Sequence, residues 1–451
     1  MIRKDHPLFH YADRYAHLSN NLYNAALFQI RQVFTGYDKE KRTPNEEEIF
    51  AELELVQKKY PKFRLSRVLT YEMLDKLMRV TGNPDFFAGL PMQTAQAVLR
   101  EAARDFRNWL DALDSYKEDP GKFLGRPRMP HYRKKGTVRM VTITNQDAVL
   151  YPPRKGGRQT EGSALKLPHT RYRQPMPHIR TGADLREVHL VPYHGIYLLT
   201  LVVEDQAPPF YPEAPETAAI DFGVDNIAAI VCTDGSAAVY KDGALLAGNR
   251  LFAKEKGKAV SLLTRGEKHA ASRSAHLDRI SVKHRMFTHD QLHKLSTAII
   301  RYCVRHRVGT LVLGVNRYWK QGVSMGRRNN QNFVTLPIAE LRDMILWKAQ
   351  IAGIVTILQE ESYTSKADIT VRDYIPTYGV DDHRACFHGR RTERGLYRCS
   401  GGLEVNADCN GAANIMRKAL PDIWGDRTDF RFLAVPESIG FRKLNPKYQT
   451  A

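Results

Sequence analysis

The stretch "AAIDFGVDNIAAIVCTDG" (residues 218–235) decides the fold class of the C-terminal part of this chain. Asp221 stands in an otherwise apolar strand, where an ionised carboxylate is costly unless a cation or a donor network compensates it. Downstream, strand patterns (309–316 and 354–361) alternate with helix patterns (about 255–306, 338–353 and after 406). This alternation predicts an α/β layer around a mixed or parallel sheet.

A second acidic position follows the run "IVTILQEE" (354–361), which we expect to be a buried strand that delivers Glu360 and Glu361 at its exit. Adjacent strand residues point to opposite faces, so one of the two faces inward. Asp408 precedes a helix, and from sequence alone it is either an N-cap or a functional acid. Three acids from separate elements suit hard divalent cations, and two Mg²⁺ ions can clamp a phosphodiester.

Two further regions precede this one. Helical spacing of apolar residues predicts an all-α lobe over 1–117, with one helix started by Pro91. Strand-like runs with a hairpin turn near His194–Gly195 predict a β-rich domain over 118–212. The remainder, 213–451, carries the α/β pattern, so the fold class is α+β multidomain. Within 121–136, cations interleave with flat side chains as expected for nucleic-acid contact, a solvated loop face being the alternative; the candidates are Arg126, Arg128, Tyr132, Arg133, Lys134 and Lys135.

The composition of the chain indicates which kinds of binding partner to expect. The 451 residues include 68 Lys+Arg against 49 Asp+Glu, a formal charge of +19 that favours a polyanion such as nucleic acid. No run of about 18 apolar residues and no signal-peptide pattern occurs, so we expect a cytoplasmic protein and no membrane partner. Five cysteines without a C-x-x-C spacing argue against a disulfide framework.

Five ordered motifs together resemble the TnpB family, the RNA-guided nucleases of insertion sequences related to type V CRISPR effectors. They are "AAIDFGVDNIAAI", "VLGVNRYWKQGVSMGRRNNQNFVTLP", "EESYTSKAD", "GRRTERGLYR" and "NADCNGAANIMRK", and "LSNNLYNAALFQIRQ" and "DPGKFLGRPRMPHYRKKG" extend the likeness toward the N-terminus. The resemblance implies a helical recognition lobe, a β-barrel wedge domain and a RuvC-like nuclease domain of RNase H fold. Its implied partners are a guide RNA from the transposon end, target double-stranded DNA and the displaced single strand, cut next to a short flanking motif. It also implies a prokaryotic protein that is nucleoid-associated when bound to DNA.

One departure concerns the middle catalytic acid. Most TnpB proteins carry it on the strand that matches "TLVLGVN", where this chain has Gly314. One branch of the family supplies the acid just before "YTSK", and Glu361 matches that position, with Glu360 as the fallback. The resemblance therefore implies that Asp221, Glu361 and Asp408 are the catalytic residues and hold two Mg²⁺ ions.

A second departure concerns zinc. Many relatives insert a four-cysteine ribbon, whereas the insertion at about 376–403 offers only His383, Cys386, His388 and Cys399, whose spacings fit no tetrahedral zinc pattern. We expect a metal-free insertion whose arginines touch nucleic acid: Arg390, Arg391, Arg394 and Arg398. A further loop, which contains "RYWKQ" and "GRRNNQNF", combines cations with amide side chains. It is suited to phosphate contact, and the alternative is a polar loop that only covers the sheet edge. The candidate residues are Trp319, Lys320, Arg327 and Arg328.

Alternative functions stay open at this stage. Gly314 is also what a decayed site would show, as in a nuclease-dead RNA-guided DNA-binding repressor, although acids remain at 221, 361 and 408. A transposase or transposon accessory protein is a further alternative, although no nucleophilic tyrosine motif for strand transfer is found. A plain RNA-binding protein would use only the basic loops.

Overall fold

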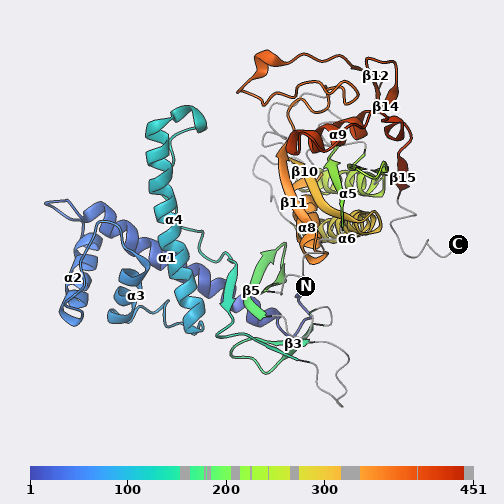
Figure 1. Ribbon diagram of the computed structural model, residues 1–451. Coiled ribbons are helices and arrows are strands. Elements are labelled where there is room, and N and C mark those ends of the chain that lie inside the picture. Colours follow the sequence, from blue (N-terminus) through green and yellow to red (C-terminus); the bar gives the residue numbers. More distant parts are fainter. Residues whose placement is uncertain are drawn as a thin grey trace. The chain divides into compact units, whose positions relative to one another are not determined.

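The computed structural model describes residues 1–152, 163–176, 179, 184–204, 214–223, 226–241, 243–264, 274–315, 336–393 and 395–440. The chain divides into two compact units, Met1–Gln206 and Ala207–Ala451 (Figure 1). Some of the sequence candidates lie outside the described residues, namely most of the basic loop at 151–162, the four candidates of the 316–335 segment (Trp319, Lys320, Arg327, Arg328), and Arg394. No helix among the described residues is long and apolar enough to cross a membrane.

Helices form the first part of unit 1: α1 (Phe9–Gly36), α2 (Pro44–Lys59), α3 (Tyr71–Val80), α4 (Met92–Glu118) and the short 3-10 helix η1 (Pro120–Lys122). Local sequence sets their starts. Thr43 and Glu46 form a reciprocal capping box at the start of α2, with Pro44 at the first helical position. Pro91 precedes α4, as the sequence predicts. The all-α character expected for this part of the chain is therefore present.

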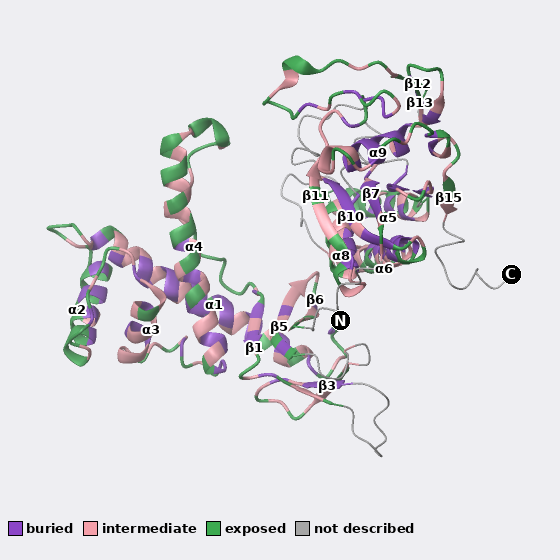
Figure 2. Ribbon diagram, in the orientation of Figure 1, coloured by how far each residue is buried: buried purple, intermediate pink, exposed green. Residues whose placement is uncertain are grey.

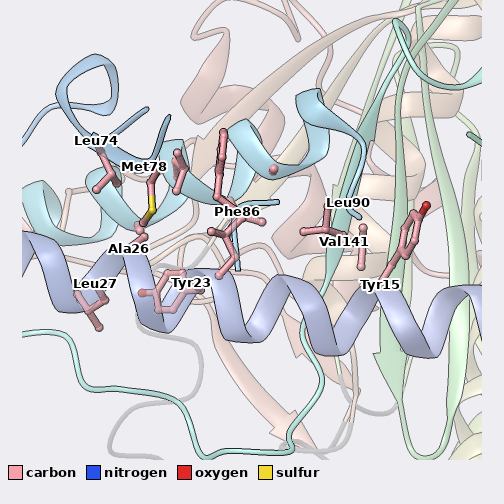
Figure 3. Close-up of a cluster of buried hydrophobic side chains, with 14 of the residues drawn as sticks. Tyr15, Tyr23, Ala26, Leu27, Leu74, Met78, Phe86, Leu90 and Val141 are labelled. Atoms are coloured by element: carbon pink, nitrogen blue, oxygen red, sulfur yellow. The ribbon is translucent and has the colours of Figure 1, made fainter. Parts of the chain in front are cut away.

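These helices share one hydrophobic core with the strands that follow them. Figure 3 shows Met78 of α3 pointing toward Ala26 of α1, and Val141 of the first strand lying beside Leu90. All four side chains are buried. Burying a side chain the size of Met or Val contributes about 1.5–3 kcal/mol, so this shared core ties the helices and strands of unit 1 into one body.

The strands of unit 1 form two antiparallel sheets. One has the order β1-β5-β6 (Val141–Thr144, Asp184–Tyr193, Ile196–Glu204) and the other β2-β3-β4 (Val149–Tyr151, Ser163–Lys166, Arg173–Met176). The β5–β6 hairpin turns at His194 and Gly195, both at positive φ, where the sequence predicts the turn. Among the described residues both sheets are open and three-stranded, and no closed barrel is found.

Unit 2 is built on a six-stranded mixed sheet with the order β11-β10-β7-β8-β9-β15. Its first three strands, β7 (Glu216–Asp221), β8 (Ala228–Cys232) and β9 (Ala237–Lys241), form an antiparallel meander. Strands β10 (Val308–Val315) and β11 (Val355–Glu360) run parallel to β7, and β15 (Glu437–Gly440) runs parallel to β9. This is the mixed sheet that the strand and helix alternation predicts.

Helices cover both faces of this sheet. α5 (Gly243–Leu263), α6 (Ala275–Arg305) and α8 (Ile338–Ile351) contribute to one core with Ile220 and Leu313, whereas α9 (Ala407–Ala419) packs on the opposite face with Ala219 and Val312. Strand alternation therefore places Asp221 and Gly314 on the α9 face. Cys303 of α6 is fully buried in the first of these cores, where it packs as a small hydrophobic side chain.

One sequence expectation about the sheet is wrong. The run 354–361 was expected to be a buried strand, but β11 is the edge strand, and Val355 and Leu358 are 44% and 54% exposed (Figure 2). An apolar run gives the same sequence pattern in an edge strand and in a central strand, because the pattern depends on hydrophobicity and not on how many strands flank it. The insertion after β11 contains the 3-10 helix η2 (Asp382–Arg384) and the small sheet β12-β13-β14 (Arg390–Glu393, Leu396–Arg398, Glu404–Asn406), and η3 (Arg431–Leu433) follows α9.

Candidate active site

Three elements bring the sequence-predicted acids to one edge of the unit 2 sheet. β7 ends at Asp221, β11 ends one residue before Glu361, and Asp408 lies in the first turn of α9. Because β7, β10 and β11 are parallel, their carboxyl ends meet at the same edge. Ile220 pairs with Leu313, and Gly314 pairs with Gln359, so the acids stand beside the end of β10.

Two glycines allow this close approach. A Cβ atom added at Gly314 would lie 2.7 Å from Glu361 Oε2 and 2.8 Å from Ile415 Cδ1. A Cβ atom at Gly411 of α9 would lie 2.5 Å from Asp221 Oδ2. Real Cβ atoms essentially never come so near, so any side chain at either position would displace a carboxylate. The Glu361 carboxylate therefore occupies the space that a side chain on β10 would otherwise fill.

The two neighbouring glutamates have different surroundings. Glu360 accepts a hydrogen bond from Lys418 Nζ at 2.7 Å and from the Ser362 backbone N–H at 2.7 Å. Burial alone would raise the pKa of Glu360, but the hydrogen bonds from Lys418 and Ser362 outweigh it and lower the pKa. Glu361, by contrast, acts electrostatically on Asp221. The structure thus places Glu361, and not Glu360, beside the other two acids.

Asp408 is not the N-cap of α9. Asn406 takes that role, since its Oδ1 accepts from the backbone N–H groups of Asp408 and Cys409 at 3.0 and 3.1 Å. Asp408 Oδ2 accepts instead from Asn226 Nδ2 at 2.7 Å, and its Oδ1 lies 3.7 Å from the guanidinium of Arg391. The Asp408 carboxylate is thereby oriented by a neutral amide and left available for a cation.

The electrostatics of the site are dominated by negative charge. Burial raises the pKa of Asp221 well above its usual range, and the charges of Glu361 and Asp408 raise it further, against a smaller opposing effect of Arg391. The described residues provide no hydrogen-bond donor to the Asp221 carboxylate. A carboxylate in this situation is stabilised by a bound cation.

The donor set fits a hard divalent metal, because carboxylate oxygens are the ligands that Mg²⁺ and Mn²⁺ prefer. In the part of the chain that the structure describes, no group of three His, Cys, Asp or Glu side chains lies close enough together, as the side chains stand, to hold a metal ion. The fit therefore rests on the uncompensated charge at Asp221 and on the chemistry of the three carboxylates.

Sequence reasoning missed three residues that support this site. Asn226 orients Asp408, Asn406 caps α9, and Lys418 engages Glu360. Asn226 and Asn406 both lie inside motifs that carry the family resemblance, at five residues after Asp221 and two before Asp408. Lys418 at the end of α9 carried no signal beyond a favourable cation in the last helical turn.

Two of the four possible zinc ligands have other partners. His388 Nδ1 pairs with Asp373 Oδ1 at 2.5 Å, and Cys399 is buried next to Asp368. Cys386 is exposed. Asp368, which is fully buried, accepts hydrogen bonds from Ser400 N and from Thr370. The base of the insertion is therefore held by an acid-centred hydrogen-bond network.

The basic linker of unit 1 runs along α1. Asn24 exchanges two hydrogen bonds of 2.9 Å with the backbone of Arg133, and the Arg31 guanidinium lies 4.8 Å from the centre of the Tyr132 ring. These contacts fix the backbone and leave the charged side chains exposed: Arg126, Arg128, Arg133, Lys134 and Lys135. In the insertion, Arg390 and Arg391 of β12 are exposed too, whereas Arg398 pairs with Glu404. The linker thus presents the positive face that nucleic-acid binding requires.

Two family models match segments that contain Asp221, Glu361 and Asp408. The family model OrfB_IS605, described as "Probable transposase", matches residues 200–319, and a second model, described as "Cas12f1-like, TNB domain", matches residues 339–415. The TnpB-like protein ORF457 of Acidianus two-tailed virus is 27% identical over 213 residues, which cover 46% of this chain and 43% of that relative. The match thus spans less than half of the relative's length.

Two solved structures also resemble the chain. A Cas12f1–sgRNA–target DNA complex matches with 14% identity and a TM-score of 0.45, covering 90% of this chain and 82% of the other. A CRISPR–Cas12f ternary complex matches with 13% identity and a TM-score of 0.35, covering 90% and 81%.

Proposed function

Because this chain belongs to the TnpB family, we propose that it is an RNA-guided, Mg²⁺-dependent DNA endonuclease that cleaves guide-matched DNA next to a short flanking motif. The observation that carries the proposal is the meeting of Asp221, Glu361 and Asp408 at the carboxyl ends of parallel strands, with the pKa of Asp221 raised by burial and by the other two acids. Acids that repel one another in this way are characteristic of functional sites.

The topology of unit 2 supports a RuvC-like assignment. Counted from β7 in chain order, the first five strands of the sheet have the order five-four-one-two-three, with an antiparallel meander followed by two strands parallel to the first, and β15 adds a sixth strand beside β9. This is the strand order of the RNase H fold. In this assignment Asp221 lies at the end of the first strand and Asp408 lies in the first turn of α9. Glu361, which directly follows the edge strand β11, is the third acid.

Each residue has a distinct part in the proposed reaction. Asp221, Glu361 and Asp408 hold two Mg²⁺ ions, which when bound supply positive charge for the attacking and leaving oxygens of the phosphodiester. Asn226 keeps Asp408 turned into the site through its 2.7 Å hydrogen bond. Arg391, half exposed and 3.7 Å from Asp408, is placed to contact a DNA phosphate beside the acids.

Unit 1 would hold the nucleic acids. In the proposed arrangement its helices form the recognition lobe, its strands belong to the wedge domain, and the exposed cations of the linker contact the phosphates of the guide RNA. Base pairing between guide and target then reads the DNA sequence, and the protein reads the flanking motif and the backbone. The formal charge of +19 supports this division, because neutralised phosphates release condensed counterions.

The absence of an acid on β10 does not favour the nuclease-dead alternative. In a decayed site, loss of the side chain at position 314 would leave a gap. Here the Glu361 carboxylate lies where that side chain would be, 2.7 Å from a Cβ atom at Gly314. The glycine and the glutamate are complementary, as expected for a site that obtains its third acid from the neighbouring strand.

The proposal is tested with the purified protein, its copurified RNA and a plasmid that carries the guide-matched target, in Mg²⁺ or in EDTA. We expect cutting in Mg²⁺ only, lost in Asp221→Ala and retained in Asp429→Asn, which removes an exposed acid of the same unit. Target binding without cutting in every metal would contradict the nuclease and favour the repressor. Metal-dependent cutting that persists in Asp221→Ala would refute the assigned site.

A further inference from the structure

Unit 1 contains a cavity whose lining includes no residue of the basic linker. It has a volume of about 400 Å³, and it is lined by the ends of β2 and β3 and by the loop that follows β3. Side chains of several chemistries surround it: Asp147, Tyr151, Lys166, His169 and Arg171. The volume falls at the small end of the range for ligand sites, about 300–1,000 Å³.

Asp147 gives this cavity a hydrogen-bond acceptor that the protein does not use. Within the described residues, its Oδ2 is buried and has no hydrogen-bond partner. Burial also raises the pKa of Asp147, against an opposing effect of His169. An unpaired buried acceptor destabilises the folded state, and a ligand that donates a hydrogen bond to it would remove that cost.

The other walls supply cations and an aromatic ring. Lys166 and Arg171 line the cavity, and the Arg173 guanidinium lies 4.4 Å from the centre of the Tyr151 ring. The loop is held in a defined shape, since His169 has a φ of +55° and its Nδ1 is 2.8 Å from the Tyr15 hydroxyl on α1. A left-handed backbone is unfavourable for a non-glycine residue, and the Tyr15 contact helps to offset this strain. The cavity is thus pre-formed.

We propose that this cavity binds one guanine base of a single-stranded nucleic acid, with Asp147 accepting from the base edge and Lys166 and Arg171 contacting the adjoining phosphates. Guanine presents two neighbouring donors, N1–H and the 2-amino group, to a carboxylate, whereas uracil presents one donor between two acceptors. Unstacked bases read on their Watson–Crick edges beside aromatic rings are the usual mode of sequence-specific RNA recognition. This inference rests on the proposed function only in that unit 1 binds a nucleic acid. It adds the identity of one nucleotide that unit 1 recognises.

The test measures binding and needs neither metal nor target. Full-length protein freed of copurified RNA is titrated with labelled seven-nucleotide strands, all uridine or with one central guanosine, in ribose and deoxyribose forms. We expect the guanosine strand to bind about 10-fold more tightly than the uridine strand, in line with one good base contact. A preference confined to the ribose strands assigns the guide RNA as the source, and one confined to the deoxyribose strands assigns the displaced DNA.

Variants separate recognition from folding. Asp147→Leu should abolish the guanosine preference and leave the melting temperature unchanged or higher, because the lost carboxylate was unpaired. Asp111→Leu, an exposed acid on α4, should keep the preference. Lys166→Ala and Arg171→Ala should each reduce the salt slope by about 0.7. Equal affinity for both strands in the wild type, or a preference that survives Asp147→Leu, would overturn the proposal whether or not the protein cleaves DNA.

Discussion

Two groups of acids in unit 2 differ in their surroundings: Asp368 and Asp373 are buried, whereas Asp221, Glu361 and Asp408 are half-buried. In the first group, Asp368 accepts from the backbone of Ser400 at 2.6 Å and from the backbone and hydroxyl of Thr370 at 2.9 and 2.7 Å. Asp373 accepts from the backbone N–H groups of Asp368 and His388. Burial alone would raise the pKa of Asp368, but these donors outweigh it and lower the pKa.

The second group, Asp221 with Glu361 and Asp408, lacks such compensation. The pKa of Asp221 is raised, and the only donor to Asp408 among the described side chains is the neutral amide of Asn226. The difference lies in the donors around each group. The acids with a full set of donors stabilise the fold, and the acids without them are the ones that we propose to bind a cation.

The sharpest consequence concerns Asp221. Asp221→Asn should reduce cleavage by about 1,000-fold, since it removes a metal ligand, and it should keep or raise the melting temperature, since it relieves repulsion with two neighbouring acids. Plasmid cleavage rates and thermal melts of the same preparation check both effects. A lower melting temperature would mean that Asp221 stabilises the fold as Asp368 does, and it would contradict the distinction between the two groups.

The adjacent glutamates provide an internal control. Glu361→Gln should reduce cleavage by about 100-fold, because an amide is a poorer metal ligand. Glu360→Gln, at the residue that pairs with Lys418, should stay within about threefold of the wild type. Single-turnover cleavage rates decide between them, and the reverse order would move the third acid to Glu360.

Asp368 should show the opposite behaviour to Asp221. Asp368→Asn keeps the shape but presents an amide to donors that pointed at a carboxylate, so we expect a loss of about 2–3 kcal/mol in the free energy of unfolding. Urea unfolding of the variant measures it, with Asp429→Asn as the exposed control. A stability equal to that of the wild type would mean that the network does not hold the insertion.

The smallest expected effect is a pH dependence. Because the pKa of Asp368 is lowered on folding, its stabilising contribution is present above its ordinary pKa of 3.8 and is lost as the pH falls through the lower, folded value. The stability difference between wild type and Asp368→Asn should therefore shrink between about pH 5 and pH 3. Urea midpoints at several pH values report this, and a difference that grows on acidification would contradict the assignment.

Local pattern predicted much of this architecture. The Pro91 helix start, the His194–Gly195 turn and the alternation after Asp221 are signals carried by a few neighbouring residues, and the structure confirms each of them. The position of β11 was not predictable in this way, since an edge strand and a central strand can share one apolar run.

The site was predicted in part for the same reason. Asp221 could be predicted because it is a charged residue in an apolar strand. The choice between Glu360 and Glu361 could not, because it depends on Lys418, which is distant in sequence. Likewise, Asp408 looked like an N-cap because the true cap, Asn406, is recognisable only from its hydrogen bonds. Contacts between remote segments, which set donors and pKa values, are not encoded in local periodicity.

Metal binding by the nucleic-acid-free protein is the decisive measurement. Calorimetric titration with Mn²⁺ should show binding to the wild type and to Glu360→Gln with the same affinity, and binding at least about 10-fold weaker in Glu361→Gln, because only Glu361 lies with Asp221 and Asp408. Equal Mn²⁺ affinity in all three proteins would show that these acids do not form a shared metal site.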